Sequence, residues 1–216
     1  TTLHAGGKFD NSAYKTSGGL HGVGVSCVNA LSDSLVAEVH RDGHIFVQKY
    51  SKGKPLGPVE ITGDCNDTGT IITFHPDAEI FTQTIVYKYD TLAHRMRELA
   101  YLNKGIEIVL TDERELVDVF EVDENGDSKS TGKQQFRQDV FYSSEGLKEF
   151  IDYLDAGATQ LIPEAICVQN DKVIPIDIAL SYNNGFSEKI YSYVNNINTV
   201  EGGTHLQGFK MGLSRS

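Results

Sequence analysis

The stretch Gly18-Gly19-Leu20-His21-Gly22-Val23-Gly24 is the most informative part of this chain, and an apolar-rich segment, residues 25–31, follows it directly. Four glycines in seven residues carry a large entropic cost, which indicates positive φ angles or a ligand close to the main chain. The next segment predicts a helix, so the loop leads into a helix N-terminus, where free N–H groups favour phosphate. The side chains available to the buried face of that helix are Val25, Val28, Ala30 and Leu31.

The glycine spacing separates this loop from two common nucleotide-binding motifs. Gly19-x-x-Gly22-x-Gly24 reverses the order of the dinucleotide fingerprint, and the loop lacks the Gly-Lys-Ser/Thr ending of a P-loop. Short glycine motifs are weak signals. The loop alone therefore leaves two interpretations open, a phosphate cradle or a glycine-rich turn before a buried helix.

Length and composition predict a folded chain with one large domain or two small ones. The chain has 216 residues, of which 39% are hydrophobic, and this is enough for a substantial core. It contains no apolar run of about 18 residues and no signal-like N-terminal segment. We therefore expect neither export nor membrane insertion, and the cytoplasm is the expected compartment.

The three cysteines, Cys27, Cys65 and Cys167, are far apart in the sequence. They form no Cys-x-x-Cys motif, and no histidine pairs with them nearby in the sequence. Their spacing predicts neither a disulfide framework nor a zinc site, and reduced thiols are the simplest expectation.

The chain is strongly acidic. Thirty Asp and Glu residues against nineteen Lys and Arg give a formal net charge of -11, which opposes attraction to a phosphate backbone. We expect that this segment does not hold DNA by itself. Acidic side chains concentrate between Asp112 and Asp127 without an EF-hand pattern, so a solvated, poorly ordered loop is favoured over a metal site.

Hydrophobic patterns in the first half of the chain predict a β-hairpin, a further strand and a helix. Two strand-like runs flank Asp42-Gly43, a strong signal for a tight turn, and the apolar residues before Asn103-Lys104-Gly105 recur at helical spacing. The predicted elements are strands at 35–40, 45–50, 70–74 and 106–110 and a helix at 90–102.

The second half is less regular. Residues 111–138 show no convincing periodicity and indicate a long hairpin tip or an insertion. Ser143 or Ser144 is predicted to cap a helix that ends near Gly157. Further predicted elements are strands at 174–182 and 189–195 around a turn at 183–185, and a helix at 206–213. Because hairpin signals outnumber strand–helix–strand crossovers, an α+β fold is expected, with a mixed or mostly antiparallel sheet and helices on one face.

Four segments together resemble the B-subunit family of bacterial DNA gyrase. They are Leu3-His4-Ala5-Gly6-Gly7-Lys8-Phe9-Asp10, Ser17–Ser26, Thr68-Gly69-Thr70 and Glu201-Gly202-Gly203-Thr204-His205-Leu206. The resemblance implies part of a gyrase, Hsp90, histidine-kinase and MutL-type ATPase sandwich over residues 1–144. It further implies the start of a ribosomal-S5-like transducer domain over residues 145–216, with an acidic lineage insertion at 117–138.

The resemblance also implies an ATP site. The segment from Gly6 to Gly24 is expected to form a lid, with Lys8 near the phosphates, Tyr14 near the adenine and Thr70 beside the base. The implied ATP-binding residues are Gly7, Lys8, Tyr14, Gly19, Leu20, His21, Gly22, Val23, Gly24 and Thr70. Taken singly, Lys8 is better explained as a solvated charge, Tyr14 is also explained as a packing aromatic, and Thr70 equally as a strand residue.

The implied activity is that of an ATP-hydrolysing type II DNA topoisomerase. Its expected partners are the gyrase A protein in an A2B2 heterotetramer, a second copy of the gyrase B protein, and double-stranded DNA. In the family the catalytic base, the Mg2+ ligand and the adenine-reading aspartate precede the position of Thr1, and the transducer lysine follows Ser216. The chain is therefore expected to be an internal, inactive fragment without catalytic or metal-binding residues. Alternatives are the corresponding ATPase protein of topoisomerase IV and a non-topoisomerase, nucleotide-gated module.

Overall fold

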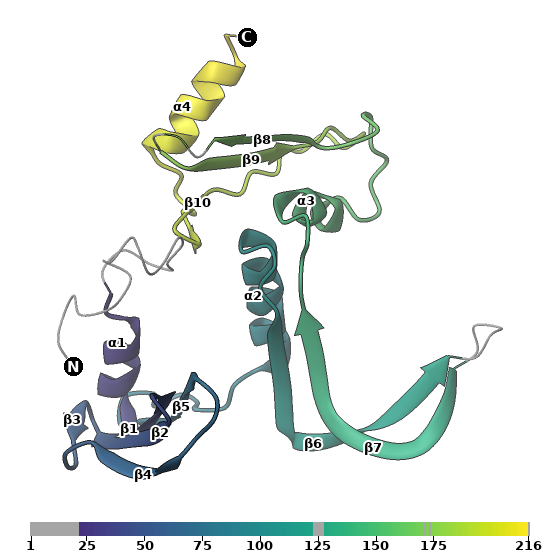
Figure 1. Cartoon of the computed structure of the whole chain (residues 1–216). Helices are drawn as coiled ribbons and strands as arrows, with labels where there is room; N and C mark the ends of the chain where they lie inside the picture. The colour runs from purple at the N-terminus through teal and green to yellow at the C-terminus, as the bar shows by residue number, and fades with distance from the viewer. Residues whose placement is uncertain (1–21, 123–127, 171, 173, 216) are drawn as a thin grey trace. The chain divides into compact units, whose positions relative to one another are not determined.

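The computed structural model describes residues 22–122, 128–170, 172 and 174–215 (Figure 1). The chain forms two compact units, Thr1–Val86 with Tyr191–Ser216 (unit 1) and Tyr87–Ile190 (unit 2). All strand pairs among the described residues are antiparallel. This confirms the predicted α+β class, while the boundary at residues 144–145 stays a prediction.

Unit 1 contains a short helix, one five-stranded sheet, a small hairpin and a C-terminal helix. Their bounds are α1 (Gly24–Ala30), β1 (Ser32–Arg41), β2 (His44–Ser51), β3 (Lys54–Pro55), β4 (Glu60–Asp64), β5 (Gly69–Pro76), β10 (Tyr193–Val194), β11 (Ile197–Asn198) and α4 (Thr204–Leu213). The helix predicted at 206–213 is confirmed by α4.

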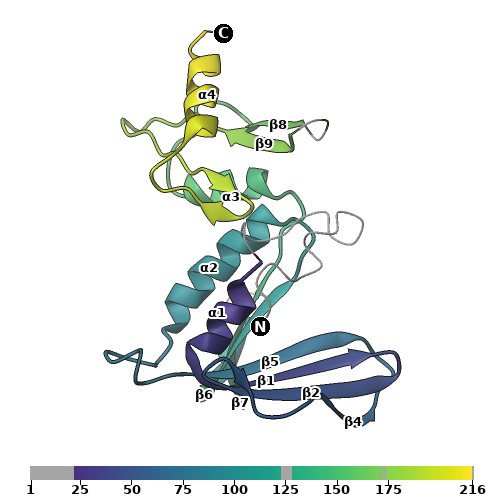
Figure 2. The ribbon, with the colours of Figure 1, turned by 90° about the vertical axis from the view of Figure 1, so that its left-hand side faces the viewer.

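The sheet of unit 1 has the order β3-β2-β1-β5, and β4 also pairs with β2 (Figure 2). The predicted hairpin is confirmed, with Arg41 opposite His44 at its end. Asp42 and Gly43 both have positive φ, 52° and 82°, as a two-residue turn of the I′ type requires. The strand predicted at 70–74 is β5 and pairs with β1 along its length.

The helix predicted after the glycine loop is α1, but its predicted apolar face is wrong. Val25 is 62% exposed and Leu31 41%, whereas the polar Asn29 is 5% exposed. The helix has only seven residues and contacts β1 and β2, so few of its positions can be covered. Gly53 has φ +78°, and a Cβ there would lie 3.3 Å from the main chain of Ala30. Glycine thus permits a tight turn next to α1.

Unit 2 packs one helix on a long hairpin and a second helix on a shorter one. Its elements are α2 (Tyr89–Leu102), β6 (Ile108–Val122), β7 (Ser128–Phe141), α3 (Leu147–Leu154), β8 (Ile166–Asn170) and β9 (Ile176–Leu180). The core cluster consists of Tyr89, Ala93, Ala100 and Phe141, with Met96, Ile108 and Leu110 packed against it. The helix predicted at 90–102 is confirmed by α2.

Strands β6 and β7 confirm the long hairpin that was one of the two expectations for residues 111–138, and they correct the expectation of a poorly ordered loop. Their ladder pairs Ile108 with Phe141 and continues outward through Asp118 and Gln134, in a long curved hairpin (Figure 1). The side chains of its outer part are mostly exposed on both faces, so burial imposes no alternation of apolar and polar residues. The backbone ladder alone defines these strands. Residues 123–127 lie outside the described part of the chain.

The predicted cap of α3 is shifted. Gly146 is the N-cap residue and has no side-chain cap of its own. The Gly146 N–H donates to Ser143 Oγ at 2.8 Å, and Ser143 is fully buried. Ser143 therefore stabilises the turn before the helix and is not the N-cap residue itself.

Strand pairing after α3 also differs from the prediction. The strand predicted at 174–182 contains β9, but β9 pairs with β8, which no sequence pattern indicated. The predicted turn at 183–185 is an Asx turn, in which Gly185 N–H donates to Asn183 Oδ1 at 2.8 Å. The strand predicted at 189–195 is reduced to β10 because Asn195 and Asn196 have positive φ, 49° and 65°, and turn the chain back into β11.

Candidate nucleotide-binding site

The described end of the glycine loop has the backbone that its sequence predicts. Gly22 has φ +64°, a left-handed conformation that glycine adopts without strain. Val23 is the N-cap residue of α1 and provides no side-chain cap, and its carbonyl accepts the Cys27 N–H at 2.8 Å. The first amides of a helix lack intrahelical partners. The turn from Gly22 to Gly24 therefore presents N–H groups to which an anion can bind.

Thr70 is the other described candidate, and it lies on β5. It pairs with Val39 of β1, and its side chain is exposed. Strand β1 begins at Ser32, next to α1, and Val39 is near its other end. Thr70 therefore lies near the end of β1 that is farther from α1. Among the described residues, it forms no direct hydrogen bond with the Gly22–Gly24 turn.

The remaining candidate residues lie outside the described part of the chain. They are Gly7, Lys8, Tyr14, Gly19, Leu20 and His21. Their roles at the phosphates and the adenine stay predictions.

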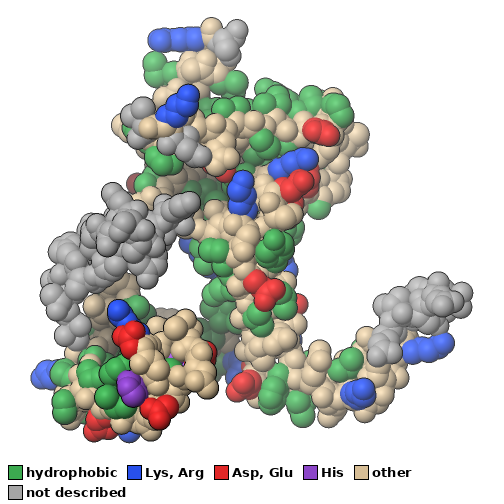
Figure 3. All heavy atoms as spheres, viewed as in Figure 1, with side chains coloured by type: hydrophobic (Ala, Val, Ile, Leu, Met, Phe, Trp, Pro, Cys, Tyr) green, Lys and Arg blue, Asp and Glu red, His purple; other side chains and the backbone are tan. Residues whose placement is uncertain are grey.

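A cluster that the sequence did not predict surrounds His40, beside Thr70. His40 Nε2 lies 2.8 Å from Glu38 Oε1, and Nδ1 lies 2.8 Å from Asp67 Oδ1. Hydrogen bonding to Glu38, and then to Asp67, raises the pKa of His40. The same bond to His40 lowers the pKa of Asp67. Figure 3 shows histidine and acidic side chains close together on this sheet.

One feature of the sequence indicates part of this cluster. Glu38 and His40 are two residues apart on a predicted strand, so both side chains point to the same face. The register of β1 and β5 places His40 opposite Gly69, which brings the nearby residue Asp67 to the imidazole. The register was the missing information.

Cys65 lies in the same place, which its sequence spacing did not indicate. One ligand atom each of His40, Cys65 and Asp67 lies within 4.8 Å of the others. The Cys65 thiol donates weakly to the carbonyl oxygens of His44 at 3.3 Å and Asp67 at 3.5 Å. His40 and Cys65 are distant in sequence and meet only through strand pairing.

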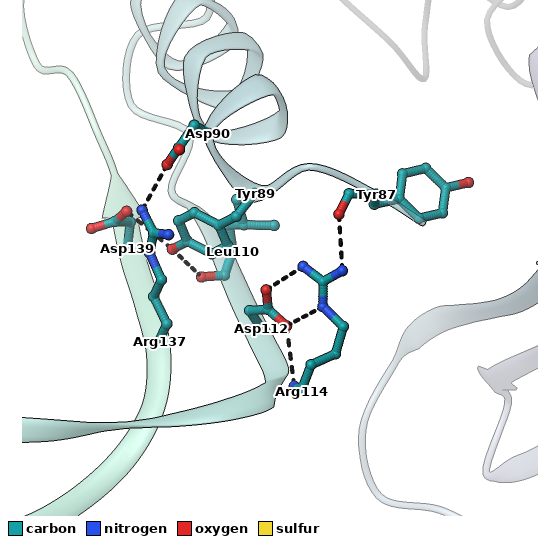
Figure 4. Close-up of polar contacts among 8 residues, drawn as sticks. All are labelled: Tyr87, Tyr89, Asp90, Leu110, Asp112, Arg114, Arg137 and Asp139. Carbon is teal, nitrogen blue, oxygen red and sulfur yellow. Dashed lines mark hydrogen bonds and ion pairs between the residues drawn. The ribbon is translucent and has the colours of Figure 1, made fainter. Parts of the chain in front are cut away.

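Unit 2 holds a second polar cluster, around Tyr89 (Figure 4). The Tyr89 hydroxyl donates to Asp139 Oδ2 at 3.0 Å and to the Leu110 carbonyl at 3.3 Å. The Arg137 guanidinium lies 3.8 Å from the centre of the Tyr89 ring and donates to Asp90 at 2.7 Å. Burial, and then Asp139, raises the pKa of Tyr89.

Arg114 completes this cluster on β6. Its guanidinium binds both carboxylate oxygens of Asp112, at 2.7 and 2.5 Å, and the Tyr87 carbonyl at 2.9 Å. The Arg114 contact lowers the pKa of Asp112 to about 2. Each guanidinium group is matched by a carboxylate, with the Tyr87 carbonyl added at Arg114 and the Tyr89 ring at Arg137, which is typical of a structural network rather than a binding site.

Comparisons with known proteins add the family. The family described as DNA gyrase B matches residues 146–216. A DNA gyrase B protein from Eisenibacter elegans is 53% identical over 208 residues, which cover 96% of this chain and 40% of that protein. The gyrase B protein from Clostridium acetobutylicum is 48% identical over 217 residues, 100% of this chain and 31% of its own. The chain therefore spans less than half the length of these relatives.

A solved structure supports the same assignment. The crystal structure of the 43K ATPase domain of Thermus thermophilus gyrase B, in complex with an aminocoumarin, matches with a TM-score of 0.72 at 30% identity. The match covers 90% of this chain and 48% of that one. Among the described residues, no helix is both long and apolar enough to cross a membrane. The relatives, the family match and the shared fold together show that this chain belongs to the DNA gyrase B family.

Proposed function

We propose that this chain contributes the phosphate-binding lid and the base-side strand of an ATP site in a DNA gyrase B protein. The observation that carries the proposal is the Gly22 turn. Its positive φ directs the chain into the uncapped first turn of α1, in a family with a known ATPase-domain structure. Such a turn offers backbone N–H groups to a phosphate.

In this proposal the lid binds the triphosphate, and β5 helps to position the adenine. The amides of the Gly19–Gly24 segment donate to the triphosphate, and Lys8 adds a positive charge. Thr70 and Tyr14 hold the adenine end. Mg2+ offsets phosphate charge when bound, and residues outside this chain hold it.

We propose that binding is coupled to a larger cycle in the intact protein. ATP orders the lid, two gyrase B proteins close on each other, and the transducer relays closure to the gyrase A protein. The A2B2 complex then breaks, passes and rejoins double-stranded DNA in the bacterial cytoplasm. The acidic charge of the chain, -11, fits contact with DNA through other parts of the complex.

The test uses the full-length protein with a non-hydrolysable ATP analogue, and binding is measured by calorimetry. Gly22→Ala forces a Cβ into a left-handed position, which costs about 1–2 kcal/mol, and narrows the phosphate path. We expect analogue affinity to fall about tenfold or more, since 1.4 kcal/mol is a factor of about ten. ATP-dependent supercoiling should fall with it.

Gly43→Ala is the matched control. Gly43 also has a positive φ, 82°, and open space around it, but it lies in the β1–β2 turn. Both variants introduce the same kind of strain. Equal losses of analogue binding in the two variants would contradict a phosphate-binding role for the Gly22 turn.

A further inference from the structure

Three side chains with metal-binding atoms meet near the C-terminal end of β1 in the unit 1 sheet. His40 comes from β1, and Cys65 and Asp67 come from the segment between β4 and β5. Their ligand atoms all lie within 4.8 Å of one another. Tetrahedral Zn2+ with bonds of about 2.0–2.3 Å holds its ligand atoms roughly 3–4 Å apart. Small side-chain rotations therefore suffice to close the three groups around one ion.

The imidazole is already oriented as a metal ligand requires. Glu38 Oε1 lies 2.8 Å from Nε2, on the side away from Asp67. In metal sites a carboxylate of this kind accepts the N–H of one ring nitrogen and leaves the other as the ligand. Here Nδ1 is the nitrogen left to bind the ion, and Asp67 Oδ1, a second ligand, lies 2.8 Å from it. A metal ion takes the place of the proton between these two atoms.

Cys65 supplies a donor that decides which metals suit the site. A thiolate with an imidazole and one carboxylate favours Zn2+ and its neighbours, whereas Mg2+ and Ca2+ prefer oxygen donors. Cys65 is half-buried and forms no disulfide, while Cys27 and Cys167 are exposed. When the metal binds, the Cys65 thiol releases its proton to solvent and the sulfur binds as thiolate.

We propose that His40, Cys65 and Asp67 bind a transition-metal ion of the Zn2+ type, with Glu38 as a positioning residue. Three protein ligands leave the fourth tetrahedral position to water. The ion ties β1 to the segment that leads into Thr68-Gly69-Thr70. It therefore steadies the strand that carries Thr70, and it is separate from the Mg2+ of the nucleotide.

The first test needs no variant. The full chain is treated with a thiol-alkylating reagent with and without Zn2+, and modification of each cysteine is followed by peptide mass spectrometry. We expect Zn2+ to slow alkylation of Cys65 at least about tenfold, because a metal-bound thiolate is a poor nucleophile, and to leave Cys27 and Cys167 unchanged. Mg2+ should protect none of them. Equal rates at Cys65 with and without Zn2+ would overturn the proposal.

The second test replaces Zn2+ by Co2+, whose thiolate charge-transfer absorption reports a cobalt–sulfur bond. The wild-type chain should show the band, and Zn2+ should displace it. Cys65→Ser should abolish the band, whereas Cys27→Ser and Cys167→Ser should keep it. A band that persists in Cys65→Ser contradicts the assigned ligands.

The same Co2+ assay distinguishes the role of His40 as a ligand from that of Glu38 as a positioning residue. His40→Gln should remove most Co2+ binding, while the neighbouring control His44→Gln should not, because the His44 ring pairs with Asp64 instead. Glu38→Gln should weaken binding about 10–100-fold, as loss of an outer-shell carboxylate does. Equal binding by the two histidine variants would exclude His40 as a ligand.

Discussion

The cluster at His40 and the cluster at Tyr89 are built from similar charged groups but are matched differently. At Tyr89, two guanidinium groups meet carboxylates and a ring face, with bidentate geometry at Asp112. At His40, one imidazole lies between two carboxylates, and a thiol stands beside it. The first cluster is complete without a ligand. The second has an excess of negative groups and a soft donor.

How the charges are paired, rather than their number, separates a structural network from a binding site. Arginine cannot lose its proton and bridges carboxylates permanently. Histidine and cysteine exchange a proton for a metal ion. We therefore expect the Tyr89 cluster to govern the stability of unit 2, and the His40 cluster to respond to metal.

The largest effect is expected from Tyr89→Ala. Tyr89 is 7% exposed and belongs to the core cluster of unit 2, so truncation leaves a cavity and removes the ring under Arg137. The expected cost is about 3–5 kcal/mol, measured by urea unfolding. Tyr142→Ala is the control, because Tyr142 is 56% exposed, and its cost should stay within about 0.5 kcal/mol. Similar losses in the two variants contradict the assignment.

The next effect concerns the metal. Zn2+ at about 100 times its Kd should stabilise the unit 1 sheet by about 2.7 kcal/mol, since it binds only the folded arrangement. Hydrogen exchange should slow in β1 and β5 and stay unchanged in β6 and β7. The Cys65→Ser chain should show no change in either region. Protection that spreads equally over both units points to non-specific binding.

A smaller effect is expected from Tyr89→Phe. This substitution keeps the ring beneath Arg137 and removes only the hydroxyl that donates to Asp139 and Leu110. The loss should be about 1 kcal/mol, again by urea unfolding. A loss as large as that of Tyr89→Ala would mean that the hydroxyl, and not the ring, dominates the cluster.

The smallest effect is a pH dependence at Asp112. Its pKa in the folded chain is about 2, below the ordinary 3.8. Stability from the contact with Arg114 is therefore present above pH 3.8 and is lost as the pH falls through about 2. Unfolding curves of wild type and Asp112→Asn should differ at about pH 5 and converge toward about pH 2. In an Arg114→Gln background the two curves should stay parallel.

Local signals predicted much of the fold because their causes are local. Asp42-Gly43 fixes a tight hairpin through two positive φ angles, and the apolar spacing before Asn103 fixes α2. A long hairpin was one of the two expectations for residues 111–138, but the bounds of β6 and β7 could not be predicted because their exposed faces need no alternation. Strand β8 was not predicted, because the segment that contains its partner β9 was expected to form a hairpin with residues 189–195 instead.

The candidate sites also contain one feature that the sequence predicted and one that it did not. The sequence predicts positive φ angles in the glycine loop, and Gly22 has φ +64°. The contact of Cys65 with His40 could not be predicted, because it depends on the register that pairs His40 with Gly69.

The sequence by itself determined the family, the antiparallel α+β class and the glycine turn, since these follow from motifs and from short-range backbone preferences. Only the tertiary structure decided which polar side chains meet. It placed Arg137 on Tyr89 and His40 beside Cys65. The physical reason is that strand register joins residues that are far apart in sequence, and a shift of one residue turns every side chain to the opposite face.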